Sequence, residues 1–244
     1  MDMEELQQEA AIRAEAAKAL TTMIERFSGQ DGELQAIVDK INGTTTDSPD
    51  MFGNTPKAKA LKAAVQCGQP EVFRAIMDSC HPTQDDKDRF WKTFLVHASS
   101  TPVALLNVIL PRFKDELNQR PKDNAGLPLS YAIEHYICGY GPKEFVIIML
   151  ELGADPLLKP NDAHRKPHDI LQSRVASPYQ MISSYIDQGI PKHKIIKEGL
   201  SEPCMERCRE IKEIFDRAIA AQRQSSWASD VQQKGQAGFG DRFA

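Results

Sequence analysis

The chain has 244 residues, of which 41% are hydrophobic and 26% are charged, a composition typical of folded globular proteins rather than disordered ones. The formal net charge of −4 gives no general reason to expect nucleic-acid binding, which favours basic surfaces. No run of about 20 apolar residues is present, so we expect no membrane-spanning helix. The acidic start lacks the features of a signal peptide, and the five Cys are scattered, so we expect a cytoplasmic protein without a disulfide framework.

Two helices are predicted at the start of the chain. Residues 4–28 are rich in Ala, Glu and Gln and place Leu20, Met23, Ile24 and Phe27 at helical spacing, and a second apolar face is expected over residues 32–41. Residues 1–50 carry eleven acidic and four basic residues. This predicts an acidic, helical beginning of the fold.

From residue 53 onward the pattern changes to pairs of short helices. The predicted pairs are 57–68 with 69–80, 86–99 with 101–117, 127–138 with 142–153, and 166–175 with 177–189. In each pair Pro stands at or near the start of the second helix, where its missing N–H costs nothing. The second helices open at intervals of about 31, 42 and 34 residues, which indicates an internal repeat.

The third pair resembles the ankyrin repeat family. Its segment DNAGLPLSYAI at 123–133 places Pro128, Leu129 and Ala132 where the ankyrin pattern has Pro, Leu and Ala. The segment EFVIIMLELGADP at 144–156 ends in the Gly-Ala-Asp of that family, with Gly153 predicted to stop the helix in a left-handed conformation. The other pairs match less well, and HYICGYGPK inserts about five residues into the third.

The resemblance implies an all-α, ankyrin-like helical repeat solenoid with helical caps at both ends. Residues 1–50 would form the N-terminal cap, and 51–195 about four divergent helix pairs. Residues 196–224 would form the C-terminal cap, with Cys204 and Cys208 in an apolar stripe, because a stack of repeats exposes an apolar face at each end. Residues 225–244 have few spaced apolar side chains and are expected to be a disordered tail.

Two groups of side chains raise the question of chemistry. Cys204 and Cys208 with His193 supply three zinc ligands at most, whereas structural zinc needs four, so we expect no metal and no cofactor. Cys138 with His135 is a nucleophile and base only if an orienting group and an oxyanion hole accompany them. An enzyme on a helical scaffold using this pair stays as an alternative, although the sequence favours a protein that is not an enzyme.

Seven residues are candidates for contact with a partner. Trp91 lies at the edge of an apolar helical face, and Trp is enriched at binding hot spots. Tyr131, Glu134 and His135 fall between core positions and would face the concave groove of an ankyrin-like stack. His164, Arg165 and Lys166 would project from a basic turn within residues 156–200, which carry seven Lys or Arg and four acids.

The expected function is non-catalytic protein binding, as an adaptor, scaffold or regulatory subunit. A rigid stack of helix pairs loses little ordering entropy on binding, and the basic turn suggests a partner with an acidic surface. Neither nucleic acid nor a membrane is expected as a partner, and a homo-oligomer stays possible through the acidic N-terminal region of another copy. A microbial effector that acts on a host protein is a second reading of the same module.

Overall fold

The computed structural model describes residues 3–43, 55–121, 126–159, 177–188 and 202–237, and within these ranges the fold is all-α. None of the described helices combines the length and apolar character needed to cross a membrane. Two short 3-10 helices, η1 (Ala98–Ser100) and η2 (Lys114–Glu116), flank α6. The α-helices are α1 (Met3–Glu25), α2 (Glu33–Asn42), α3 (Pro56–Gln66), α4 (Pro70–Ser79), α5 (Gln84–His97), α6 (Val103–Arg112), α7 (Pro128–Ile137), α8 (Glu144–Glu151), α9 (Pro178–Gln188) and α10 (Glu202–Ala237).

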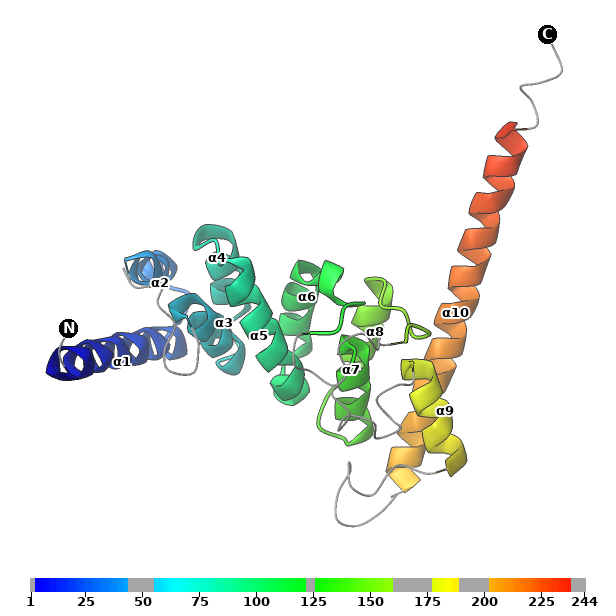
Figure 1. Cartoon of the computed structure of the whole chain (residues 1–244), viewed down its shortest axis with the longest axis horizontal. Helices are drawn as coiled ribbons and strands as arrows, with labels where there is room; N and C mark the ends of the chain where they lie inside the picture. The colour runs from blue at the N-terminus through cyan, green and yellow to red at the C-terminus, as the bar shows by residue number, and fades with distance from the viewer. Residues whose placement is uncertain (1–2, 44–54, 122–125, 160–176, 189–201, 238–244) are drawn as a thin grey trace, which may run out of the picture.

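The helices from α1 to α8 lie in two rows along the long axis of the molecule (Figure 1). In the first row α1 contacts α3, α3 contacts α5, and α5 contacts α7. In the second row α2 contacts α4, α4 contacts α6, and α6 contacts α8. Contacts between α3 and α4 and between α7 and α8 join the rows. Helices are therefore present at all three predicted pairs between residues 56 and 151, and the two helices of a pair are in contact in α3 with α4 and in α7 with α8.

A continuous hydrophobic core fills the space between the rows, from Leu20 in α1 to Phe215 in α10. Its centre is aromatic: the rings of Phe90 and Phe94 are stacked with centroids 5.7 Å apart, and Phe90 also contacts Phe73 at 5.4 Å. Such pairs stabilise a core beyond the area that they bury. Phe94 and Leu95, which share the apolar face of α5 with Trp91, are both buried.

A buried carboxylate joins the beginnings of two first-row helices. Asp86 is 2% exposed and closes a capping box with Thr83, whose backbone N and Oγ1 both donate to Oδ2 at 2.8 Å. The other oxygen, Oδ1, accepts a hydrogen bond from Oγ1 of Thr55. Thr55 is the N-cap of α3 and accepts from the backbone N of Ala58 at 3.2 Å. One side chain thus satisfies donors at the N-termini of both α3 and α5.

The predicted stop signal at the end of α8 is confirmed. Gly153 has a φ of +100°, a conformation that costs glycine little because it has no Cβ. Its N donates to the carbonyl of Leu150 at 3.0 Å, and the N of Ala154 donates to Met149 at 2.9 Å, which is the hydrogen-bond pattern of a Schellman motif. Gly68 ends α3 in the same way: its N donates to the carbonyl of Val65, and the N of Gln69 donates to the carbonyl of Ala64.

The C-terminal part of the fold departs from a simple fourth pair. The first predicted helix of that pair, 166–175, lies outside the described residues. The second, α9, makes its main contacts with α10 and α7, which belong to the cap and to the first row, whereas a fourth pair would continue the row of α8. Helix α10 buries its apolar stripe as predicted, with Cys208, Ile211 and Phe215 all 0% exposed.

Helix α10 also extends further than predicted, to Ala237 (Figure 1). A disordered tail was predicted for residues 225–244. The structure instead has a helix over residues 225–237, and residues 238–244 lie outside the described residues. Between Ser225 and Lys234 there is neither Pro nor Gly. Once a helix has nucleated, each further residue adds a backbone hydrogen bond, so the helix continues without the apolar spacing that packing requires.

A polar cluster docks α10 against the loop between α7 and α8. Glu210 accepts a hydrogen bond from Nζ of Lys143 at 2.6 Å and another from the hydroxyl of Tyr136. Burial and the bond to Glu210 raise the pKa of Tyr136 to about 12. Arg207 lies over the Tyr136 ring, 6.0 Å from its centroid, and donates to the carbonyl of Ile137 at 3.2 Å. These bonds fix the position of the terminal helix.

Removal of the Asp86 carboxylate should destabilise the fold strongly. In Asp86→Ala the backbone N and the hydroxyl of Thr83 lose their capping-box acceptor, and the buried hydroxyl of Thr55 loses its acceptor too. We therefore expect the free energy of unfolding to fall by about 2–3 kcal/mol. Urea denaturation followed by circular dichroism measures this change. The matched control is Asp85→Ala, whose exposed ion pair with Arg89 contributes less than about 0.5 kcal/mol. Equal losses in the two variants would contradict the assigned role.

The cluster around Glu210 should make stability depend on pH in the acidic range. Hydrogen bonds from Lys143 and Tyr136 hold the pKa of Glu210 below 4.5, its ordinary value. A lowered folded-state pKa gives stability that is present above about pH 4.5 and lost as the pH falls through the folded-state value. The difference between wild type and Glu210→Gln should therefore shrink on acidification.

Because these side chains are more than a third exposed, the difference above pH 4.5 should stay below about 1 kcal/mol. Urea unfolding at several pH values measures it. Glu213→Gln, an exposed change on the same helix, is the control. A wild-type advantage that stays constant down to pH 3 would contradict this account.

Candidate functional site

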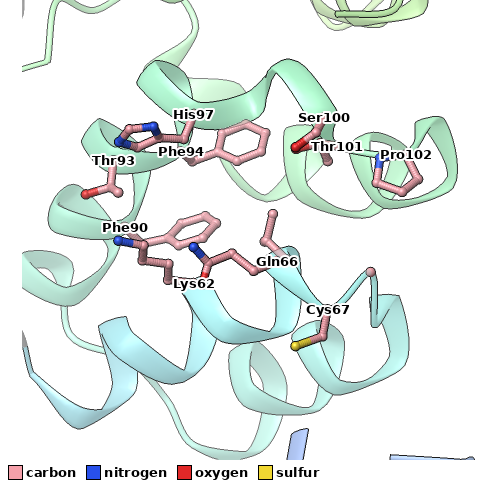
Figure 2. Close-up of a pocket in the computed structure, with 12 residues that line it drawn as sticks. Lys62, Gln66, Cys67, Phe90, Thr93, Phe94, His97, Ser100, Thr101 and Pro102 are labelled. Atoms are coloured by element: carbon pink, nitrogen blue, oxygen red, sulfur yellow. The ribbon is translucent and has the colours of Figure 1, made fainter. Parts of the chain in front are cut away.

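A pocket of about 240 Å³ lies between α3 and α5, two neighbouring helices of the first row (Figure 2). We call it the α3–α5 pocket. Its walls come from the C-terminal half of α3 with the turn at Gly68, from α5, and from residues 100–102 before α6. The buried Asp86 network ties the N-termini of these two helices together, so the pocket is built on helices whose positions are fixed by hydrogen bonds.

Aromatic and aliphatic side chains form the apolar part of the pocket. Phe90 and Phe94 stand one turn apart on α5 and line it together with Val65 of α3. Both rings are almost fully buried, at 3% and 4% exposed, because their other faces belong to the aromatic core. Two tightly packed aromatic rings thus form part of the pocket wall, and such a wall favours contact with an apolar group.

Polar side chains surround this apolar surface. Lys62 and Gln66 are one turn apart on α3, and Thr93 and His97 are one turn apart on α5 (Figure 2). Lys62 is exposed and has no salt bridge to a described residue. The twelve residues that line the pocket include no Asp and no Glu. The rim therefore offers hydrogen-bond donors and positive charge without a competing carboxylate.

Cys67 is the one thiol in the lining of the α3–α5 pocket. It is half-buried, and burial together with the charge of Glu25 raises its pKa. Since the thiolate is the nucleophile and the thiol is not, Cys67 is protonated at neutral pH and is poorly suited to attack a substrate. The chemistry of the pocket favours binding over covalent catalysis.

A second pocket of about 390 Å³ lies between the N-terminal half of α5 and residues 116–121. Its lining mixes three acids, among them Glu116, with three bases, among them Arg120. Burial, Asp88 and Asp115 raise the pKa of Glu116. Because acids and bases are mixed in its lining, this pocket has little electrostatic preference for a negative or a positive ligand. The α3–α5 pocket is therefore the better candidate for a selective site.

Trp91, predicted to contact a partner from the edge of an apolar helical face, is buried. The side chain is 3% exposed and its ring is stacked on Phe113, with centroids 4.8 Å apart and an interplanar angle of 4°. Helical periodicity placed Trp91 at the edge of the apolar face of α5, but the chain after α6 covers that edge. The indole nitrogen is buried without a hydrogen-bond partner among the described residues.

The predicted residues of α7 lie in the same row as the α3–α5 pocket. Tyr131, Glu134 and His135 are all half-buried. Nε2 of His135 lies 2.9 Å from the carbonyl oxygen of Leu95 in α5, so this ring bridges two first-row helices. That contact occupies one ring nitrogen, which weakens the case for His135 as a general base acting with Cys138.

The basic turn with His164, Arg165 and Lys166 lies outside the described residues, as does His193. Cys204 and Cys208 pack in the buried apolar stripe of α10, and burial raises the pKa of Cys208 to about 12. No group of three potential metal ligands converges within the described ranges.

Sequence reasoning missed the residues that form the α3–α5 pocket. One available signal was the segment Pro56–Gln66, which contains three Lys and no acid. Another was the i, i+4 spacing of Thr93 and His97 on a helix that also carries the apolar residues Phe90 and Phe94. The pocket itself depends on α3 lying against α5, which the periodicity of either helix alone does not reveal.

Comparison of the chain with protein-family models, with curated proteins and with solved structures finds no match. The all-α fold and the two rows of helices therefore stand on the structure alone. The likeness to ankyrin repeats rests on the sequence patterns at 123–133 and 144–156.

The protonated state of Cys67 can be tested directly. Because its pKa is raised above the ordinary 9.0, the rate of alkylation by iodoacetamide should keep increasing with pH to beyond pH 9. Peptide mapping by mass spectrometry separates Cys67 from the buried Cys80, which serves as the unreactive reference. A rate that levels off near pH 7 would reveal an activated thiolate and contradict this reading.

Proposed function

We propose that this chain is a non-catalytic protein-interaction module, an ankyrin-like stack of helix pairs that binds a segment of a partner protein along its first row. The observation that carries the proposal is the α3–α5 pocket, a preformed apolar depression with a polar, acid-free rim on that row. Protein-binding surfaces combine these two features in their energetically dominant positions.

The size of the pocket supports a protein ligand over a cofactor. At about 240 Å³ it is smaller than the roughly 300–1,000 Å³ of pockets that enclose small molecules. A single side chain of a partner, inserted as an anchor, suits such a volume. The neighbouring surface of the row would contact the rest of the partner segment and exclude water around the anchor.

The α7 residues extend the proposed surface. Tyr131, Glu134 and His135 lie one helix further along the first row than α5. A partner segment that crosses the row from α3 toward α7 would meet them after the pocket. The basic turn at 164–166 remains a predicted contact. Both an adaptor and a microbial effector in a cytoplasmic setting would use the first-row surface in the same way.

Filling the pocket should weaken binding. Peptides selected from a displayed random library on the wild-type protein should bind Thr93→Trp at least about 10-fold more weakly, because a large side chain would occupy the site of the anchor. Fluorescence anisotropy with labelled peptides measures the affinities. Gln119→Trp, which places the same side chain in the second pocket, should leave them unchanged.

Two results would contradict the proposal. One is a selection in which no peptide is enriched above the background of the empty matrix. The other is a set of peptides that bind wild type and Thr93→Trp equally well while losing affinity for Gln119→Trp, which would move the binding surface to the second pocket.

A further inference from the structure

We propose that the segment bound by the α3–α5 pocket is acidic and carries one apolar anchor side chain flanked by Asp or Glu. This inference rests on the proposed function and adds the chemistry of the partner to it. The anchor would contact Phe90 and Phe94, and the carboxylate would lie at the end of the pocket formed by Lys62, Thr93 and His97 (Figure 2).

The charge of α3 is the first argument. The helix contains Lys57, Lys59 and Lys62 and no acidic residue, so one helix of the pocket carries three positive charges within its 11 residues. Exposed charges act over a screening length of about 8 Å at physiological salt, which is about one and a half helical turns. Lys62 is the one of the three that lines the pocket, so a carboxylate above the pocket would lie within this range of its charge.

The distribution of charge within the pocket gives the bound segment a direction. Burial and the negative charge of Glu25 in α1 raise the pKa of Cys67, so an acid acts on this part of the lining. Cys67 and Lys62 stand at different ends of the pocket lining (Figure 2). A carboxylate is thus disfavoured at the Cys67 end and favoured at the Lys62 end.

The polar side chains at the favoured end are suited to a carboxylate. The ammonium of Lys62 and the hydroxyl of Thr93 donate hydrogen bonds, and the amide of Gln66 offers two further donors. Bonds from such donors to a carboxylate are stronger than those to a neutral acceptor. The second pocket, with three acids in its lining, lacks this preference and provides a comparison within the same molecule.

The experiment is a selection of a displayed random peptide library on wild type and on Lys62→Glu in parallel. Wild type should enrich peptides with Asp or Glu next to an aliphatic or aromatic residue, and Lys62→Glu should enrich Lys or Arg at that place. A wild-type-selected peptide should lose at least about 10-fold in affinity for Lys62→Glu. Lys114→Glu, the same charge change on the exposed η2, should keep full affinity.

The outcomes separate this inference from the proposed function. Peptides that need an open pocket, judged by their loss on Thr93→Trp, but show no acidic preference and bind Lys62→Glu fully, would overturn the inference and leave the function standing. A selection with no enriched peptide at all would overturn both. Lys62 is exposed, so Lys62→Glu should fold, and a thermal melt confirms this before the selection.

A second copy of this chain is the competing occupant. Helix α1 contains five Glu against Arg13 and Lys18, and its Ile12 is 61% exposed, so it has the charge and the apolar side chain that the pocket would accept. Sedimentation equilibrium tests this directly. Self-association that both Ile12→Asp and Lys62→Glu abolish would assign the pocket to the second copy and overturn the proposal of a separate partner.

Discussion

The hydrogen bonds of Asp86 are the constraint on which the geometry of the first row depends. A buried carboxylate is tolerated only when its oxygens are satisfied, and here the donors come from Thr83 in its own capping box and from Thr55, 31 positions earlier in the chain. The network therefore fixes the N-terminus of α3 beside that of α5. The C-terminal halves of the same helices then form the pocket, with Phe90 and Phe94 held between it and the core.

This arrangement separates two tasks within one pair of helices. The buried ends and faces of α3 and α5 stabilise the fold. Rim side chains such as Lys62 and His97 make no hydrogen bond or ion pair with a described residue. Rigid support beneath a polar rim reduces the ordering cost of binding. The lack of acids around the pocket then gives the surface a preference in charge that the second pocket does not have.

Local patterns in the sequence predict the helices well and their packing partners less well. Gly153 ends α8 as expected because this helix stop depends on the conformation of one residue. Trp91 is more buried than periodicity indicates, because Phe113, which follows α6 in the chain, stacks on it. The α3–α5 pocket could not be predicted from either helix, since it depends on the contact between Thr55 and Asp86. Helix α10 continues past residue 224 because extending an existing helix adds backbone hydrogen bonds without requiring a tertiary contact.

A crystal structure of the chain with the tightest peptide from a wild-type selection tests the central claim most directly. The account predicts an apolar side chain of the peptide within about 4 Å of Phe90 and Phe94, with a neighbouring carboxylate hydrogen-bonded to Lys62. A peptide seated on the second row, or one that places its carboxylate at the Cys67 end of the pocket, would contradict it.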